Sequence, residues 1–147
     1  KPEFDKVNLS SVLQTTVDLY NQSENVDITL SMPTDEVFIT GDKDQLLRVF
    51  SNLVKNAVQA IPEEQHGKIQ IQLLEDGSFY KVTVADNGTG IADDLIDKIF
   101  VPNFTTKTSG TGLGLAMVKS MVEGMRGSIY FDTKVGEGTV FTLRFMK

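Results

Sequence analysis

Three glycines at alternate positions, Gly110, Gly112 and Gly114, lead into an apolar segment in which hydrophobic residues recur every four positions from Leu113 onward. This pattern predicts a loop that runs into a buried helix. Glycine lets the main chain lie close against a ligand. A helix that begins after such a loop also offers unpaired N–H groups and the positive end of its dipole, both of which suit a phosphate. A glycine-rich turn that serves packing alone explains these residues equally well.

Two asparagines, Asn52 and Asn56, lie four residues apart in the clearest helical pattern of the chain, residues 43–61. This spacing places both amides on one face of the helix, with Arg48 one turn before them. The apolar residues of the segment spread widely around the helix and predict deep burial, where amides are costly unless they have partners. The pair therefore favours a polar site over two satisfied core amides.

A carboxylate, Asp86, follows an alternating segment at residues 79–85 and precedes the sequence Asn-Gly-Thr-Gly-Ile. The segment predicts a strand, so the carboxylate lies at a strand end, with Gly88 and Gly90 two and four residues further on. Taken alone, Asp-Asn-Gly is ordinary turn chemistry, in which the side chain bonds its own backbone.

Phe100 and Phe104 flank Pro102, and residues 105–112 after them are rich in Thr, Ser, Gly and Lys. A segment of this composition packs poorly, so we predict a mobile lid between Phe104 and the helix that starts at 113. Lys107 is the one cation in this stretch before the glycines.

The remaining pattern supplies the elements that must position these residues. Helices are expected over residues 11–21, 43–61 and 92–98 and from 113 onward, and strands over 27–32, 37–40, 68–74, 79–85, 128–132 and 139–145. Segments 27–32 and 37–40 are expected to form a hairpin-like unit closed by Gly41. Asn8 or Ser10 can cap the first helix, and Asp42 or Asp44 the second.

The composition of the chain excludes several classes of function. The chain has 147 residues, of which 40% are hydrophobic and 23% charged, as expected for one globular domain. The net charge of −6 argues against a nucleic-acid surface, and the absence of cysteine excludes disulfides, thiolate zinc sites and cysteine nucleophiles. No apolar run approaches the roughly 18 residues of a membrane helix, so a soluble piece without membrane contact is expected.

Five motifs occur in a characteristic order: N-x-x-x-N-A at 52–57, D-x-G-x-G at 86–90, F-x-P-x-F at 100–104, G-T-G-L-G-L at 110–115 and G-x-G-T at 136–139. In this order and at these separations they resemble the N, G1, F, G2 and G3 boxes of the catalytic, ATP-binding domain of bacterial sensor histidine kinases. These kinases belong to the GHKL superfamily, with gyrase, ninety-kilodalton heat-shock chaperones and mismatch-repair ATPases. The resemblance covers nearly the whole chain, from about residue 8 to the end.

The resemblance implies a role for each motif. Asp86 is similar to the carboxylate that accepts a hydrogen bond from the adenine amino group, and Thr139 to the hydroxyl that helps hold the adenine side through water. Asn56 is similar to the amide that coordinates Mg²⁺, with Asn52 beside it, while Lys107 would reach a phosphate from the lid. Catalytic roles thus fall on Asn52, Asn56 and Lys107. Nucleotide contacts are expected from Asn56, Asp86, Gly88, Gly90, Ile91, Phe100, Phe104, Lys107, Gly110, Thr111, Gly112, Leu113, Gly114, Leu115 and Thr139.

One departure from the superfamily pattern bears on the reaction. In the ATP-hydrolysing relatives the position of Asn52 is typically a glutamate that activates water, whereas a neutral amide cannot serve as a general base. The resemblance therefore implies slow hydrolysis and transfer of the phosphoryl group to a protein, which depends mainly on positioning and charge neutralisation.

Family members carry the acceptor histidine on an upstream dimerising helix. His66, the only histidine here, lies in a polar loop and is a poor candidate for the acceptor. Residues 1–8 are therefore expected to be a linker from an upstream dimerisation and phosphoacceptor domain, and residues 9–147 the catalytic domain.

The resemblance also implies the surroundings of this domain. We expect ATP and Mg²⁺ as cofactors, the upstream domain and a response regulator as partners, and a homodimeric parent protein in the cytoplasm, with anchoring of the parent to the inner membrane left open. The fold implied is an α/β two-layer sandwich, the Bergerat ATP-binding fold. It has a mixed, mostly antiparallel sheet of about five strands covered on one face by about three helices.

Two other functions stay open from the sequence. A stand-alone serine kinase or anti-sigma factor of the same superfamily would need no upstream acceptor helix. A non-catalytic module that senses a nucleotide would use the lid only to switch a partner.

Overall fold

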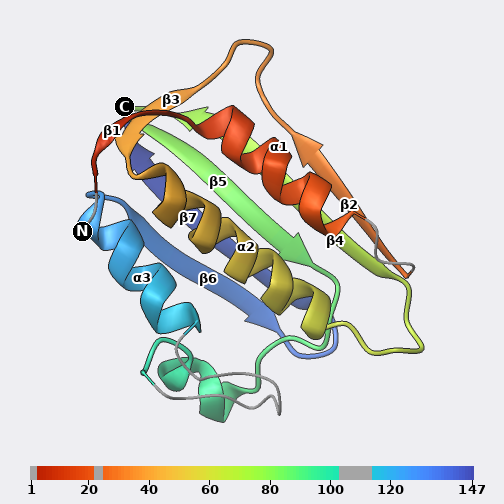
Figure 1. The fold of residues 1–147 in the computed structure, drawn as a ribbon. Helices are drawn as coiled ribbons and strands as arrows, with labels where there is room; N and C mark the ends of the chain where they lie inside the picture. Colours follow the sequence, from red (N-terminus) through yellow and green to blue (C-terminus); the bar gives the residue numbers. More distant parts are fainter. Residues whose placement is uncertain (1–2, 22–24, 103–113) are drawn as a thin grey trace.

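The computed structural model describes residues 3–21, 25–102 and 114–147. Its elements are, in chain order, β1 (Asp5–Asn8), α1 (Leu9–Tyr20), β2 (Val26–Ser31), β3 (Phe38–Gly41), α2 (Lys43–Gln59), β4 (Gly67–Asp76), β5 (Phe79–Asp86), the short 3-10 helix η1 (Asp93–Lys98), α3 (Gly114–Gly124), β6 (Ser128–Lys134) and β7 (Gly138–Met146). Helices α1, α2 and α3 cover one face of a five-stranded sheet (Figure 1). The predicted two-layer α/β sandwich is confirmed.

The main sheet has the strand order β2-β4-β5-β7-β6. Only the β2–β4 pair is parallel, and the other three pairs are antiparallel, as predicted for a mixed, mostly antiparallel sheet. Strands β4 and β5 form a hairpin around Gly77, whose φ of 62° favours glycine. The last strand, β7, lies inside the sheet between β5 and β6.

Alternation of side chains builds the core between the two layers. On β4 the residues Ile69, Ile71 and Leu73 are at most 1% exposed, whereas Lys68 and Gln70 between them are exposed. This period of two turns one face of each strand toward the helices. The buried residues of the helix layer pack against that face.

Helix α2 is the central helix, because it packs against both α1 and α3. Its buried residues recur every three or four positions and define one face: Leu46, Val49, Phe50, Leu53, Val54 and Ala57. Leu47 and Val58 are only partly buried, so the burial is more one-sided than the sequence predicts. Asp42, not Asp44, caps the helix by accepting the N–H of Gln45 at 3.0 Å. Asn8 caps α1 by accepting the N–H of Ser11 at 3.0 Å.

The predicted hairpin over residues 27–41 was wrong. Strand β3 pairs with β1, from Asp5 opposite Gly41 to Asn8 opposite Phe38, while β2 pairs in parallel with β4. A parallel pair needs a long crossover, which here contains β3 and α2. Alternation marks a strand but not its partner, so the sequence does not show that β3 pairs with β1.

The segment expected to be a linker, residues 1–8, contains a strand. Residues 5–8 form β1, with Val7 buried against the core. The segment is too short to show a period, which is why the sequence does not reveal it.

Candidate functional site

Three polar side chains occupy one row across the sheet. Asp86, the last residue of β5, is paired with Thr139 in β7, and Thr139 is paired with Thr133 in β6. Thr139 lies two residues before the buried Phe141, so it shares the face that the helices cover. It is only 5% exposed. The row thus brings a carboxylate and two hydroxyls together beneath the helix layer.

The carboxylate of Asp86 shapes the turn that follows it. Its Oδ1 accepts the N–H of Gly88 at 2.8 Å, so the ordinary turn chemistry of Asp-Asn-Gly is present. An ionised carboxylate has two oxygens and about four lone-pair sites. Its acceptor capacity is therefore larger than this turn requires.

The loop from Asp86 to Ile91 passes between the end of α2 and the β6–β7 turn (Figure 1). The N–H of Thr89 donates to the carbonyl of Ala60 at 3.0 Å, and the N–H of Gly136 donates to the carbonyl of Thr89 at 2.8 Å. A Cβ at Gly88 would lie 2.5 Å from the Ala60 oxygen. Gly90 has a φ of 76°, and a Cβ there would lie 2.5 Å from the Lys134 oxygen. Both glycines of the D-x-G-x-G motif are therefore required by close backbone packing.

Asn87 clamps the same loop to the connection before β4. Its side-chain oxygen accepts the N–H of Lys68 at 2.8 Å, its side-chain nitrogen donates to the carbonyl of His66 at 3.2 Å, and Gln65 donates to its main-chain oxygen at 2.5 Å. Sequence reasoning treated Asn87 as a turn residue only. Nothing in a single sequence separates such a clamp from a simple turn, because its partners lie about twenty positions away.

His66, the only histidine of the chain, pairs with a carboxylate at the surface. Its Nε2 lies 2.8 Å from Oδ2 of Asp27 in β2, and both side chains are at least half exposed. This contact links the edge strand to the loop before β4 and gives His66 a structural partner outside the predicted site.

Thr133 is the second residue that sequence reasoning missed. Its Oγ1 accepts the N–H of Ile91 at 2.8 Å and lies 2.9 Å from Oγ1 of Thr139. The expected strand stopped at residue 132. Extending its alternation by one residue would have placed Thr133 on the same face as Ile129 and Phe131, as the polar member of an apolar row.

Helices α2 and α3 bring two further motifs together. The side-chain nitrogen of Asn52 donates to the carbonyl of Arg48 at 2.9 Å. A Cβ added to Gly114, the first residue of α3, would lie 3.3 Å from Oδ1 of Asn52. The amide oxygen of Asn52 therefore faces the start of α3. Asn56 lies one turn further along α2 and is half-buried.

Phe100 anchors the segment that follows η1. Its ring meets those of Phe131 and Phe141 edge to face, with centroids 5.9 and 6.4 Å apart, and Nζ of Lys119 in α3 lies 5.2 Å from its centroid. Ile91 and Leu115, two other predicted nucleotide contacts, are partly buried against the core.

The remaining predicted site residues, Phe104, Lys107, Gly110, Thr111, Gly112 and Leu113, lie outside the described residues. The lid and most of the phosphate-binding loop therefore stay predictions.

A metal site made only of charged or imidazole ligands is absent from the described part of the chain, where no three His, Cys, Asp or Glu side chains gather suitably. Mg²⁺ prefers oxygen ligands and usually keeps several waters, so a single amide oxygen with ligand phosphates suits it. The half-buried amide of Asn56, one turn from an amide that faces α3, fits that kind of site.

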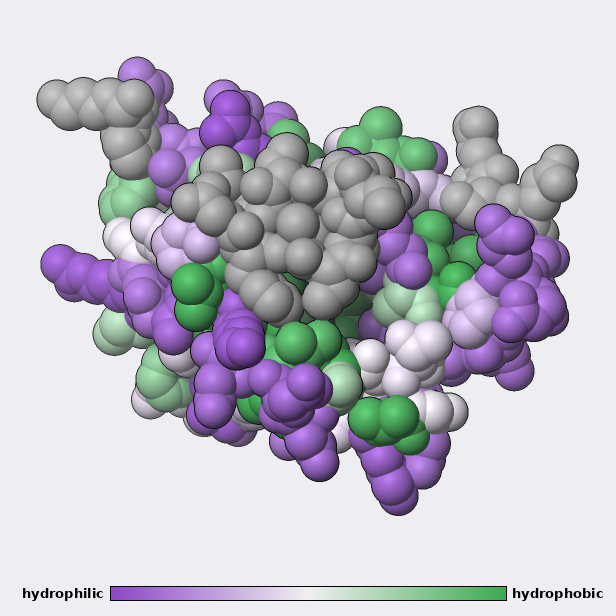
Figure 2. Space-filling model, turned by 90° about the horizontal axis from the view of Figure 1, so that it is seen from below, coloured by the Kyte–Doolittle hydropathy of each residue, from purple (hydrophilic) through white to green (hydrophobic). Residues whose placement is uncertain are grey.

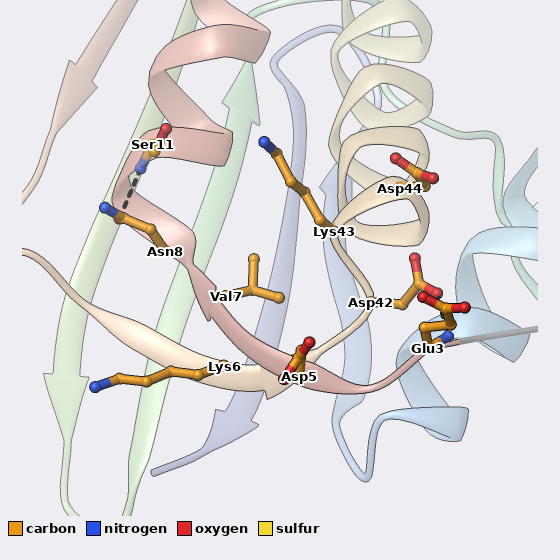
Figure 3. A pocket seen from close by; sticks show the side chains of 9 residues that line it. All are labelled: Glu3, Asp5, Lys6, Val7, Asn8, Ser11, Asp42, Lys43 and Asp44. Atoms are coloured by element: carbon orange, nitrogen blue, oxygen red, sulfur yellow. Dashed lines mark hydrogen bonds between the residues drawn. The ribbon is translucent and has the colours of Figure 1, made fainter.

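A polar pocket of about 590 Å³ lies at the other end of α2, where β1 and the first turns of α1 and α2 meet (Figure 3). Asp42 lines it, and its carboxylate accepts N–H groups from Gln45 at 3.0 Å and Glu3 at 2.7 Å. These bonds, from Gln45 first and then Glu3, hold the pKa of Asp42 below its ordinary value of 3.8. The carboxylate and the cap at Asn8 thus have structural roles in this pocket.

The described residues on the side of the molecule seen in Figure 2 are mostly hydrophilic, with smaller hydrophobic areas between them. Among the described residues, no helix is both long and apolar enough to cross a membrane.

Comparison with known proteins shows the family to which the chain belongs. A family model described as histidine kinase-, DNA gyrase B- and HSP90-like ATPase matches residues 41–147. The chain is 41% identical over 140 residues to the sensor histidine kinase ZraS of Escherichia coli K12. That match covers 93% of this chain and 30% of ZraS, so the chain spans about a third of the length of this relative.

Solved structures give the same picture at the level of the fold. The nucleotide-free catalytic domain of histidine kinase ThkA superposes with a TM-score of 0.87 and 32% identity, covering 99% of this chain and 96% of that one. ThkA in complex with the response regulator protein TrrA superposes with a TM-score of 0.80 and 26% identity, covering 98% of this chain and 42% of that one.

Proposed function

Because this chain belongs to the family of histidine kinase-, DNA gyrase B- and HSP90-like ATPases, we propose that it is the ATP-binding catalytic domain of a sensor histidine kinase. The domain would transfer the γ-phosphoryl group of ATP to a histidine on an upstream helix. In this step the bond between the γ-phosphorus and the bridging oxygen breaks, a P–N bond to the imidazole forms, and ADP leaves.

One observation carries the proposal. The row of Asp86, Thr139 and Thr133 lies under the helix layer, and the loop after Asp86 is pressed against the end of α2 with no room for side chains at Gly88 and Gly90. A carboxylate beside a close-packed glycine backbone suits a flat base that carries an exocyclic amine. The ionised Asp86 would accept one hydrogen of the adenine amino group.

The phosphates would lie between α2 and the start of α3. The amide oxygen of Asn52 faces Gly114 there, and the N–H groups at the beginning of α3 suit phosphate oxygens. Asn56 would hold Mg²⁺, whose chemistry is to neutralise phosphate charge. The neutral amide of Asn52 cannot act as a general base, which favours transfer of the phosphoryl group to a protein over hydrolysis of ATP.

The names of two relatives support a proposal about the partners of the parent protein. ZraS is named a sensor histidine kinase, and ThkA has been crystallised with a response regulator. We extend both to this chain and propose that a response regulator receives the phosphoryl group. From the resemblance of the motifs we also propose an upstream dimerisation domain with the acceptor histidine, a homodimeric parent and a cytoplasmic location for this domain.

The test uses the full-length parent protein with ATP labelled at the γ-position. Label should appear on the upstream histidine as an acid-labile, base-stable phosphoramidate. Asn56→Ala should abolish labelling, while Gln59→Ala, an exposed amide on the same helix, should label as the wild type does. Absence of label from the wild-type histidine would reject the kinase proposal, and equal signalling by wild type and Asn56→Ala would favour a nucleotide sensor without catalysis.

A further inference from the structure

The hydroxyl of Thr133 is a meeting point of three groups in the candidate site. Its Oγ1 lies 2.8 Å from the main-chain nitrogen of Ile91, 2.9 Å from Oγ1 of Thr139 and 3.2 Å from the main-chain oxygen of Gly138. We propose that Thr133 is a positioning residue for base recognition, which fixes the Thr139 hydroxyl as a hydrogen-bond acceptor and ties the Asp86-to-Ile91 loop to β6. This inference rests on the proposed function, because it requires a base to be read at Asp86.

The direction of each bond follows from the hydrogens available. A threonine hydroxyl has one hydrogen to donate and two lone pairs that accept. The N–H of Ile91 can only donate, so it occupies one lone pair of Thr133. The carbonyl of Gly138 can only accept, so it takes the hydrogen of Thr133. The remaining lone pair of Thr133 accepts the hydrogen of Thr139, which is the one arrangement that satisfies all three contacts.

This arrangement decides what Thr139 offers to a ligand. Since its own hydrogen points toward Thr133, Thr139 presents only lone pairs on its other side. Asp86 is directly opposite Thr139 on the neighbouring strand, and side chains so paired have Cβ atoms about 4.5–5.5 Å apart. The two residues together form an acceptor pair that suits a ligand group carrying hydrogens.

Selectivity between two purines follows. Adenine carries an amino group at C6, whereas hypoxanthine carries a carbonyl oxygen there. That oxygen would face two acceptors and bind poorly. If Thr133 lost its hydroxyl, Thr139 could rotate and donate its hydrogen to the carbonyl, so discrimination against hypoxanthine should fall.

The burial of the two threonines explains why the hydrogen bond from Thr139 to Thr133 keeps its direction. Thr139 is 5% exposed, and Thr133 is half-buried under the same helix layer. Few protein groups other than Thr133 can therefore receive the hydrogen of Thr139. The hydrogen bond from the N–H of Ile91 to Thr133 also connects residues 42 positions apart. It joins the end of the Asp86-to-Ile91 loop to β6, an edge strand of the sheet.

Isothermal titration calorimetry of the 147-residue chain with ADP and with inosine diphosphate tests the proposal. Thr133→Val should bind ADP roughly 5- to 10-fold more weakly, because a net hydrogen bond is worth about 1 kcal/mol. Its affinity for inosine diphosphate should change less, so the ratio of the two affinities should fall. Thr133→Ser keeps the hydroxyl and should stay within about twofold of the wild type in both.

Two further variants separate this role from a structural one. Thr142→Val removes the hydroxyl of a buried threonine on the other face of β7 and should leave the affinity ratio unchanged. The double variant Thr133→Val/Thr139→Val should show the selectivity of Thr139→Val alone, because Thr133 acts through Thr139. Thr133→Ala, which crowds the site less, replaces Thr133→Val if that variant does not unfold cooperatively.

If Thr133→Val lost the same factor of affinity for ADP and for inosine diphosphate, the ratio of the two affinities would be unchanged. That result would overturn the inference and leave Thr133 with a structural role. Thr133→Ser behaving like Thr133→Val would overturn it as well, since packing of the methyl group would then be responsible. A wild-type chain that binds neither ADP nor ATP would reject the proposed function itself, which is a separate result.

Discussion

Asp86 serves two purposes at the residue scale. It closes its own turn through the N–H of Gly88, and it ends β5 opposite the buried Thr139. A carboxylate held by its own backbone is preorganised, so a ligand that binds it does not have to order the side chain.

Replacing Asp86 by Asn should lower ATP affinity by about 10- to 100-fold, because hydrogen bonds to a charged acceptor contribute about 1.5–3 kcal/mol. Calorimetry with ATP measures the change. Asp132→Asn, which alters an exposed carboxylate on the opposite face of β6, is the control and should bind as the wild type does. Unchanged affinity in Asp86→Asn would exclude Asp86 as the adenine acceptor.

Gly88→Ala should destabilise the fold by roughly 1–3 kcal/mol, the usual range for a side chain forced into a packed site. The reason is the 2.5 Å approach of the added Cβ to the Ala60 carbonyl, which is backbone and cannot easily move. Urea unfolding measures the effect, and nucleotide affinity should fall with it. Gly124→Ala, whose Cβ would have no neighbour within 4 Å, is the control. Equal midpoints for the two variants would contradict the packing seen at Gly88.

At the scale of single elements, α2 depends on its cap. Asp42 accepts N–H groups from Gln45 and Glu3, which keep its pKa below 3.8. Because the folded-state pKa is lowered, the stabilisation is fully present above pH about 3.8 and is lost as the pH falls through the lower folded value.

Asp42→Asn should therefore unfold at a lower urea concentration than the wild type at neutral pH, and the difference should shrink as the pH falls below about 3.8. Asp44→Asn changes a neighbouring carboxylate that does not cap the helix and serves as the control. A difference that stayed constant down to the lowest pH would show that the charge of Asp42 does not stabilise α2.

The sequence predicted elements better than their partners. Helix α2 was found nearly to the residue because its apolar repeat and its cap are local features. The pairing of β3 with β1 was missed because strand pairing depends on segments distant in sequence. Asn87 was missed for the same reason, since its partners lie about twenty positions away. Thr133 was missed because the expected strand ended one residue too early. Asp86 and Thr139, which the motifs single out, are neighbours across β5 and β7, while their roles toward a nucleotide stay predictions.

At the scale of the whole molecule, ligand binding is expected to raise thermal stability. A nucleotide present at about 100 times its dissociation constant stabilises the fold by about 2.7 kcal/mol, or roughly 5–10 °C for a domain of this size. Mg²⁺·ATP should produce such a shift in calorimetric melting. EDTA should remove much of it, while the smaller shift given by adenosine should not respond to EDTA.

With Mg²⁺·ATP, Asn56→Ala should show only the small rise in melting temperature that the wild type shows when EDTA is present. The reason is that the amide oxygen of Asn56 is the proposed protein ligand of the metal. Gln59→Ala should keep the full response. A metal-dependent shift that survived in Asn56→Ala would place the Mg²⁺ ligand elsewhere in the chain.

The interior position of β7 has a consequence for how the protein is made. This strand follows all the other described elements, yet it separates β5 from β6 and supplies Thr139. While β7 is still inside the ribosome exit tunnel, β6 cannot join the rest of the sheet. Strand β5 is then an edge strand, and Asp86 at its end is exposed. Competence to bind a nucleotide should consequently arise only once β7 has left the exit tunnel, and ribosome-stalled chains of increasing length would reveal it as an abrupt gain of protease resistance in the presence of ADP.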